Sequence, residues 1–363
     1  MTRDGALVRA VSLGLSPADR DDDIGNERPV ADATTVSLAV SHRVQGLLAA
    51  ALEHKVVIAD AATTTAVLEA HLAALRTCIV AEETAVLAFD ALHGAGVECR
   101  VLKGIAIAEL DHDDPSHRVF GDADMLVARA DYGGALDALF CAGFIRDEPP
   151  VRAWWERRFG KAIVLRAPNG GELDLHLALT GGYFGAALDG EAVMRRPGEA
   201  IMLADRVMSA LDREDRLVQA CLHSVLGGGS GLRAQRDIAQ LLIVREADWR
   251  LTIERADVAD AVLARAIRHA WTALELTVEH PALKWAISHR ATEQQEKALA
   301  SYDAAVSSTW GPEGRGVLAA LGSFDRLRFV AGLAFPSRAS LRARDRTRWQ
   351  HVRRGSANMQ VRS

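Results

Sequence analysis

The chain has 363 residues, of which 49% are hydrophobic and 25% are charged, and its formal net charge is −5. These values are typical of a globular protein with two or three structural units, and they exclude a chain that binds nucleic acid over its whole surface. There is no Cys-x-x-Cys pair for a zinc site, no leader, and no apolar run near the roughly 20 residues that span a bilayer, so we expect a cytoplasmic protein without membrane contact.

The first third of the chain is expected to be helical after a polar start. Residues 1–30 are polar and uneven, and the run from Asp19 to Asp23 is typical of a solvated, mobile segment. Over residues 31–95 apolar side chains recur at helical spacing, and Gly94 and Gly96 are typical of a helix end. We therefore expect an N-terminal helical region of two or three helices over residues 31–95.

At residue 96 the helical spacing of apolar residues gives way to short strand-like runs, which predicts a small α/β core over residues 96–180. Strands are expected at residues 97–102, 122–127, 161–166 and 172–179, with helices at residues 105–110 and 131–141. Asn169-Gly170-Gly171 is a strong hairpin signal between the last two strands. A C-terminal helical region should follow over residues 181–335, and a basic tail over residues 336–363. The fold class is therefore α+β, a small mixed sheet flanked by helical N- and C-terminal regions.

Two carboxylates, Asp122 and Asp124, stand where the second strand begins. On a strand their side chains leave the same face, roughly 6.5–7 Å apart along the chain. Two acids so placed can bind one or two divalent cations. An isolated Asp-x-Asp pair is more often a polar turn before a buried strand, so the neighbouring elements must decide between these interpretations.

The strand after the hairpin alternates strictly between polar and apolar residues. Glu172, Asp174 and His176 share one face, and three leucines share the other. Such a polar face is either exposed to solvent, as in many antiparallel sheets, or binds cations or substrate. With Asp122 and Asp124 it would bring three or four carboxylates together, which repel one another unless cations lie between them. The combination favours a metal site.

A phosphate-binding element is indicated by Lys103 and Gly104, between the first strand and its helix. Glycine lets the backbone approach a ligand, the N-terminus of a helix favours anions, and Lys103 would supply a positive charge. A strand–glycine–helix turn is common in α/β proteins, so this signal is weak by itself. Arg118 could pair either with a triphosphate or with one of the acids.

Together these motifs resemble the uncharacterised nucleotidyltransferase family of the polymerase-β-like superfamily. The residues that carry the resemblance are Leu102-Lys103-Gly104, Arg118 with Asp122, Asp124, Leu126 and Val127, Leu173-Asp174-Leu175-His176, Leu222-His223, residues 236–242 and Phe335-Pro336. They extend over roughly residues 35–345. Lys103-Gly104 takes the place of a Gly-Ser turn in the wider superfamily, which is a departure from that pattern.

The resemblance implies a nucleotidyltransferase fold for the core and a role for each motif residue. Asp122, Asp124 and Asp174 would bind Mg²⁺ or Mn²⁺, and Asp174 would also help to activate the acceptor hydroxyl. The residues implied to bind the nucleotide are Lys103, Gly104, Arg118 and Gly121, with Glu172 and His176 as possible support. The implied substrate is a nucleoside triphosphate, with ATP as the default expectation, and pyrophosphate would be released.

The sequence leaves the acceptor open among a small molecule, a peptide and RNA, because fold does not decide substrate. It also leaves the oligomeric state open. One alternative function is a non-catalytic nucleotide- or partner-binding protein with this fold. Another is a toxin-like enzyme that modifies RNA, for which the arginine-rich stretch from Arg338 to Arg354 is the support. A basic tail that docks on the chain's own acidic surface is the favoured interpretation of that stretch.

Three further features have a structural interpretation that is favoured over a functional one. The acidic, histidine-rich segment 111–117 is expected to be a flexible loop, with a lid role as the alternative. His223 is expected to pack inside an apolar helix. Trp154 and Trp155 lie among arginines and could stack on a base, but a core or rim pair is more common.

Overall fold

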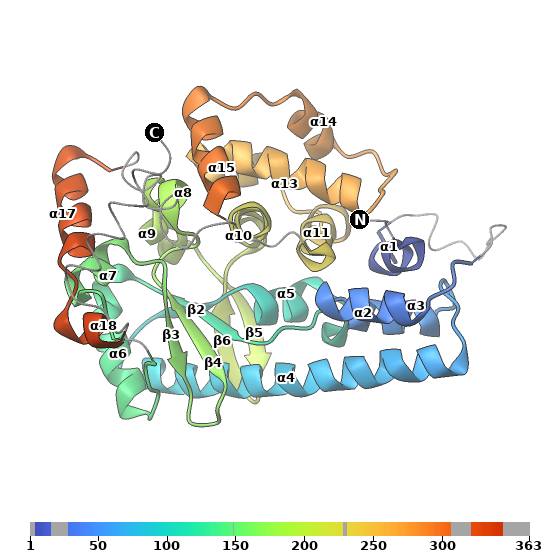
Figure 1. Cartoon of the computed structure of the whole chain (residues 1–363), viewed down its shortest axis with the longest axis horizontal. Coiled ribbons are helices and arrows are strands. Elements are labelled where there is room, and N and C mark those ends of the chain that lie inside the picture. Colours follow the sequence, from blue (N-terminus) through green and yellow to red (C-terminus); the bar gives the residue numbers. More distant parts are fainter. Residues whose placement is uncertain (1–3, 16–27, 148, 228–230, 306–320, 344–363) are drawn as a thin grey trace.

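A six-stranded mixed sheet lies between two groups of helices (Figure 1). This computed structural model describes residues 4–15, 28–147, 149–227, 231–305 and 321–343. The α+β fold class expected from the sequence is confirmed, with helices on both sides of the sheet in the chain order. None of the helices in these ranges is long and apolar enough to cross a bilayer.

The N-terminal region consists of α1 (Gly5–Val11), α2 (Ala33–Ser41), α3 (Gln45–Glu53) and the long α4 (Ala61–Gly94). Asp32 and Asp60 accept hydrogen bonds from backbone N–H groups and so cap α2 and α4. The expectation of a polar, mobile segment is wrong for α1, because Leu7 and Val11 are buried against α3 and its neighbours. The acidic run at residues 19–23 lies outside the described residues.

The strands are β1 (Cys99–Val101), β2 (Ala123–Val127), β3 (Ala162–Arg166), β4 (Glu172–His176), β5 (Glu199–Leu203) and β6 (Arg206–Ala210). Their order across the sheet is β3-β4-β2-β1-β6-β5. The central β2 is parallel to β4 and antiparallel to β1, and β1 is parallel to β6. The connections hold α5 (Lys103–Asp111), α6 (Tyr132–Cys141), α7 (Ala153–Phe159) and the short turns η2 (Pro115–His117) and η3 (Arg129–Asp131).

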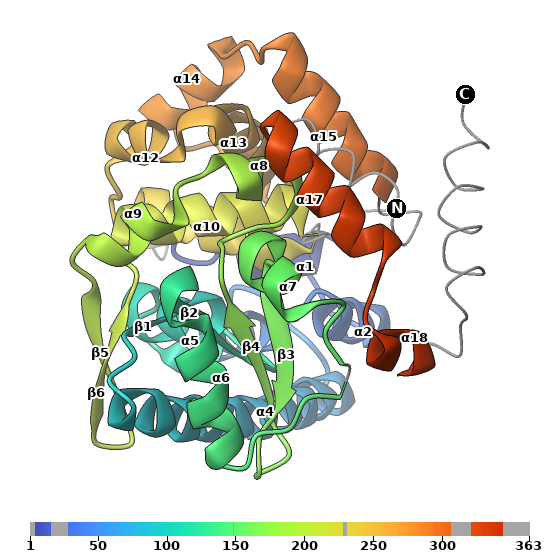
Figure 2. The ribbon, with the colours of Figure 1, turned by 90° about the vertical axis from the view of Figure 1, so that its left-hand side faces the viewer.

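The expectation that residues 181–335 are helical is wrong at the β5–β6 hairpin, which forms one edge of the sheet (Figure 2). Its turn residues Ala204 and Asp205 have left-handed φ angles of 44° and 63°. Turns of this type usually carry Asn or Gly, so Ala-Asp gives no hairpin signal in the sequence. The sheet consequently extends beyond residue 180, where the predicted core ended.

The remaining helices are α8 (Gly182–Ala187), α9 (Gly190–Arg195), α10 (Arg213–Leu226), α11 (Leu232–Ala239) with the π-helical turn η4 (Gln240–Val244), α12 (Trp249–Ala256), the turn η5 (Asp257–Ala259), α13 (Asp260–Ala273), α14 (Pro281–Ser288), α15 (Glu293–Ala305), α17 (Ser323–Ala334) and α18 (Arg338–Ala343). They lie on the far side of the sheet from α4, except α17, which packs beside α7, and α18, which follows α17 (Figures 1 and 2). Residues 344–363, which include most of the arginine-rich tail, are outside the described ranges.

The two faces of the sheet differ in chemistry because its strands alternate. Ala81, Ala85 and Ala88 let α4 approach closely, and it packs on the face that carries Leu173 and Leu175. The intervening side chains of β2 and β4 therefore point away from α4, toward α10 and α11. The alternation expected for β4 is confirmed, and its polar face becomes more buried along the strand, from the exposed Glu172 through the half-buried Asp174 to the buried His176.

Candidate active site

The central acidic pair lies on two parallel strands at the same level. The register of β2 and β4 pairs Asp124 directly with Asp174. Two residues earlier in the chain stand Asp122, just outside β2, and the exposed Glu172 of β4. Burial, and then the negative charges of Asp174 and Asp122, raise the pKa of Glu172, and the charges of Asp124 and Asp122 contribute to the raised pKa of Asp174, so the four acids interact electrostatically. The two motifs are therefore adjacent in space, although about 50 residues separate them in sequence.

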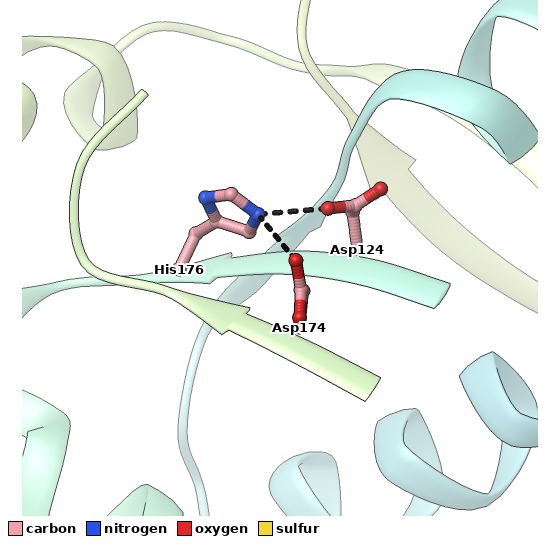
Figure 3. A group of neighbouring side chains, drawn as sticks. All are labelled: Asp124, Asp174 and His176. Atoms are coloured by element: carbon pink, nitrogen blue, oxygen red, sulfur yellow. Dashed lines mark hydrogen bonds and ion pairs between the residues drawn. The ribbon is translucent and has the colours of Figure 1, made fainter. Parts of the chain in front are cut away.

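Three side chains on these strands form a group that could hold a metal ion (Figure 3). His176 Nε2 lies 2.7 Å from Asp124 Oδ1 and 3.9 Å from Asp174 Oδ2. One potential ligand atom from each residue lies within 4.8 Å of the other two. Asp122 is not in this group, which is the only such group among the described residues.

Lys103 reaches the same point from the start of α5. Its ammonium contacts Asp124 Oδ1 and lies 3.1 Å from His176 Nε2. His176 Nε2 either donates a proton to the carboxylate or, unprotonated, accepts one from the ammonium, because one ring nitrogen cannot do both. Its Nδ1 lies 3.3 Å from the carbonyl oxygen of Ala178. Lys103 thus supplies positive charge where a metal ion would contact Asp124.

The two paired aspartates have pKa values that shift in opposite directions. Burial by itself would raise the pKa of Asp124, but the hydrogen bond with His176 and the charge of Lys103 outweigh it and lower the pKa to about 2. Burial and then the charge of Asp124 raise the pKa of Asp174. Asp174 Oδ1 is buried and has no hydrogen-bond partner among the described residues, which is unusual for a carboxylate oxygen.

This donor set fits a divalent cation. Carboxylate oxygens are the ligands that Mg²⁺ and Mn²⁺ prefer, and the orphan Asp174 Oδ1 lacks any other partner. Imidazole is a less common ligand for Mg²⁺. His176 therefore fits better as the group that orients Asp124 than as a third ligand, in line with its completely buried ring.

Beside the acids lies a pocket of about 270 Å³, which we call the central pocket. It is lined by Arg43, Lys103, Gly104, Ile107, Arg118, Phe120, Asp122, Asp124, Gln219, Ala220, His223, Gly227, Arg233 and Asp237. These residues come from the N-terminal helices, the sheet and α5, and helices α10 and α11. All three parts of the chain therefore contribute to the central pocket.

Three basic residues line the central pocket together with the acids, and we call them the cationic wall: Arg43, Lys103 and Arg233. Neither Arg43 nor Arg233 forms an ion pair with a carboxylate of the described residues, and Arg233 Nη1 donates to the carbonyl oxygen of Val119 at 3.4 Å. Burial, followed by the positive charge of Arg118, lowers the pKa of Arg233 to about 9. A negatively charged ligand would relieve this repulsion, so the wall is suited to an anion.

Two further observations mark the same wall. Among the described residues eight non-glycine residues have positive φ, and two of them, Arg43 (54°) and Lys103 (46°), line the central pocket. Strained backbone of this kind persists where the surrounding structure requires it, often at a binding site. Gln219 accepts a hydrogen bond from the Lys103 backbone N–H at 3.1 Å, while its buried Nε2 has no partner among the described residues. Nε2 is thus an available donor for a ligand.

The structure gives Arg118 an internal partner. Its Nε and Nη2 donate to the two carboxylate oxygens of Asp237, each at 2.8 Å, and both side chains are buried. Of the two pairings open from the sequence, Arg118 makes the one with an acid, and that acid lies on α11 rather than on β2. Arg118 still lines the central pocket, but its guanidinium fork is already occupied.

The two glycines of the motifs play different parts. A Cβ added to Gly104 would lie 2.5 Å from Cβ of Phe120, so the absence of a side chain permits close packing of α5 on the segment before β2. A Cβ at Gly121 would meet only Thr77 and Arg43, at 3.7 Å and 3.8 Å. Both positions lie close to the acids, and neither has the positive φ that would itself require glycine.

Two structural interpretations of the sequence are corrected. Asp111 and His112 are buried rather than part of a flexible loop, and Arg216 donates to both oxygens of Asp111 at 2.9 and 2.8 Å. His223 is half-buried and lines the central pocket instead of packing in a helical core. Burial, then the charge of Lys103, lowers the pKa of His223 to about 4, so its ring is neutral near pH 7.

The sequence motifs did not identify Arg43, Gln219 and Arg233. Each lies in a helical region more than 40 residues from the motif that it faces, and no local pattern distinguishes it from a surface residue. The one available signal was the spacing of Arg233 and Asp237. They stand four residues apart, which on a helix places both side chains on one face.

A match to a protein-family model covers the region that contains these motifs. A family model described as "Uncharacterised nucleotidyltransferase" matches residues 30–274, which include every residue of the acidic group and the central pocket. The match ends well before residue 345, where the resemblance seen in the sequence was expected to end. Curated protein sequences give no match to the chain. Because the matched range is more than half of the chain, the chain belongs to this uncharacterised nucleotidyltransferase family.

Proposed function

We propose that the chain is a metal-dependent nucleotidyltransferase that transfers a nucleoside monophosphate from a nucleoside triphosphate to an acceptor hydroxyl. The observation that supports this most strongly is that acidic and basic side chains line one pocket. Asp122 and Asp124 form the acidic wall, and Lys103, Arg43 and Arg233 form the cationic wall. A triphosphate accompanied by divalent cations carries the complementary charges. Family membership supports the same reaction type.

In this proposal Asp122, Asp124 and Asp174 bind Mg²⁺ or Mn²⁺. A bound divalent cation supplies charge stabilisation for the attacking and departing oxygens of an in-line displacement. The acceptor oxygen bonds to the α-phosphorus as the bond from that phosphorus to the bridging oxygen breaks, and pyrophosphate leaves. Asp174, which has an unpartnered carboxylate oxygen, takes the proton of the acceptor hydroxyl.

The cationic wall would bind the phosphates. Within the described residues, Arg43 and Arg233 offer guanidinium groups without ion-pair partners, and Gln219 offers an Nε2 donor that has no hydrogen-bond partner there. The ammonium of Lys103 and a divalent cation cannot both contact Asp124 Oδ1. Lys103 would therefore turn from Asp124 toward the phosphates when the metal ion and the nucleotide are bound. Arg118 would hold its place through Asp237 rather than contact the nucleotide.

The test combines purified protein, Mg²⁺ or Mn²⁺, each labelled nucleoside triphosphate and cell extract, with ATP as the first choice. We expect label in one fraction of the extract, release of pyrophosphate, and loss of both in Asp122→Ala and Asp124→Asn. Asp303→Asn, which changes an exposed carboxylate far from these motifs in sequence, is the control and should transfer normally. Transfer retained in both site variants would refute the assignment, and metal-dependent binding without pyrophosphate release would favour a non-catalytic nucleotide-binding protein.

A further inference from the structure

A second cavity, of about 610 Å³, lies between the start of η3, helix α7 and helix α17. Its described lining residues, which we call the arginine cleft, are Arg129, Ala130, Trp154, Arg157, Arg158, Arg328 and Ala331. None of them lines the central pocket. The two tryptophans of α7, which the nucleotidyl-transfer proposal does not use, have separate environments here.

Trp155 is a structural residue and Trp154 is not. The Trp155 ring packs on Phe159 and Phe329, with ring centroids 5.9 and 5.3 Å apart, and its Nε1 donates to the carbonyl oxygen of Phe329. These contacts hold α17 against α7. Trp154, by contrast, is 42% exposed and lines the arginine cleft. The interpretation as a core or rim aromatic is therefore right for the half-buried Trp155, and the exposed indole of Trp154 remains available to a ligand.

Positive charge dominates the arginine cleft. The four arginines are accompanied by no acid among the described lining residues, and within the described part of the chain only Arg158 of the four forms an ion pair, with Asp325 at 2.7 Å. The Arg129 guanidinium donates to the carbonyl oxygens of Arg157 and Gly160, which orients the group without neutralising its charge. Because the whole chain carries a net charge of −5, this concentration of cations is a local feature and not a general background.

The chemistry of the cleft distinguishes among anionic ligands. Guanidinium groups bind phosphates through planar pairs of N–H donors, and Arg328 is held 4.3 Å from the Phe324 ring centroid, which limits its orientations. An exposed indole beside such groups provides a stacking surface for a base. An acidic peptide would use the arginines and leave Trp154 without a partner. We propose that the arginine cleft binds single-stranded nucleic acid, with phosphates on Arg157 and Arg328 and a base on Trp154.

The position of the cleft relates it to the acids without making it depend on them. Arg129 follows β2, the strand that carries Asp124, by two residues. At the rise of a strand, five residues from Asp124 to Arg129 correspond to roughly 17 Å. Binding at the cleft uses no metal ligand, so it can be measured without nucleotide or metal. Asp124→Asn should bind the strand as the wild type does, and this separates a failure here from a failure of the proposed transfer.

The experiment measures the fluorescence anisotropy of fluorescein-labelled oligouridylate with the full-length chain over a range of salt concentrations. Arg157→Gln with Arg328→Gln should weaken binding at least tenfold and reduce the salt slope by about 1.4, or about 0.7 for each lost phosphate contact. Trp154→Ala should weaken binding by about tenfold with the slope unchanged. Arg250→Gln is the matched control, because Arg250 lies over the Trp249 ring as Arg328 lies over the Phe324 ring, but does not line the arginine cleft.

Other arms identify competing explanations. A parallel series with oligothymidylate distinguishes RNA from DNA as the preferred strand. A full-length variant with Arg346, Arg348 and Arg353 each changed to Gln tests the C-terminal arginines. The inference is overturned if the wild type does not bind at low salt, or if only this C-terminal variant loses affinity. It is equally overturned if polyglutamate competes as well as the oligonucleotide and Trp154→Ala has no effect, since the cleft would then bind acidic peptides.

Discussion

Replacing Lys103 with Met should tighten metal binding and weaken nucleotide binding. The ammonium of Lys103 contacts the carboxylate oxygen of Asp124 that a divalent cation would use, and the two side chains are 16% and 3% exposed. A cation must displace this ammonium before it can bind. Met keeps the length and flexibility of the side chain but removes the charge, so the substitution eliminates the competition without opening a cavity.

The size of the effect follows from the contact that is lost. A hydrogen bond to a charged group contributes about 1.5–3 kcal/mol in a buried setting, and about 1.4 kcal/mol corresponds to a tenfold change in affinity. Lys103→Met should therefore bind Mn²⁺ between about tenfold and 100-fold more tightly than the wild type. In the presence of metal, the affinity for a nucleoside triphosphate should fall by about tenfold, because one cation of the phosphate-binding wall is missing.

Calorimetric titration with Mn²⁺, alone and then with nucleotide, measures both changes on one sample. Lys297→Met is the matched control, because Lys297 pairs with Glu293 on an exposed helix face and has no part in the central pocket. Unfolding by urea checks that both variants are folded: Lys297→Met should lose no more than about 1 kcal/mol, and Lys103→Met no more than the roughly 3 kcal/mol of the contact that it removes. An unchanged or weaker affinity of Lys103→Met for Mn²⁺ would refute the idea that Lys103 and the cation compete for Asp124.

Three other predictions concern stability. Asp237→Ala should lower the free energy of unfolding in urea by about 3–5 kcal/mol, because it leaves the buried Arg118 without its carboxylate. The control Asp303→Ala breaks an exposed pair of similar geometry and should lower it by no more than about 1 kcal/mol. Gly104→Ala should cost about 1–3 kcal/mol through overpacking, but Gly121→Ala only about 0.5 kcal/mol; equal losses would contradict the packing argument. Burial lowers the pKa of His112 from 6.5 to about 3, so the unfolded chain binds a proton at this residue as the pH falls through 6.5, and the folded chain does not. The free energy of unfolding of the wild type should therefore fall by about 1.4 kcal/mol from this residue between about pH 7.5 and about pH 5.5. His112→Leu should lack this loss, which urea unfolding at the two pH values will test.

Local sequence patterns predicted the part of the site that lies on strands. The alternation around Asp174 determines which face its side chain occupies, and the spacing of Asp122 and Asp124 determines theirs. No local pattern gives the register between β2 and β4. A tight turn can fix the register of two antiparallel strands, but parallel strands are joined by a long connection. The level pairing of Asp124 with Asp174 had to come from the structure.

The cationic wall was not predictable for a different reason. Arg43 ends a turn between two N-terminal helices and Arg233 lies on α11, so their proximity depends on how helices pack on the sheet. Helix packing is determined by many weak contacts spread over the chain, none of which marks an individual arginine. The β5–β6 hairpin was missed because its turn residues adopt left-handed φ without Asn or Gly.

Buried ion pairs explain how such a composite pocket keeps its geometry. Arg118 joins the segment before β2 to Asp237 on α11, and Arg216 of α10 joins Asp111 at the end of α5. Desolvation offsets much of the attraction in buried pairs, so they contribute little net stability, but their bidentate geometry permits only one relative position of the two elements. Both pairs connect the strand that carries the acids, or its neighbouring helix, to the helices that carry Gln219 and Arg233. Gln219 and Arg233 therefore line the same pocket as the acids only when the C-terminal helices are docked, and residues 96–180 alone would have the acids and Lys103 without these two anion-binding side chains.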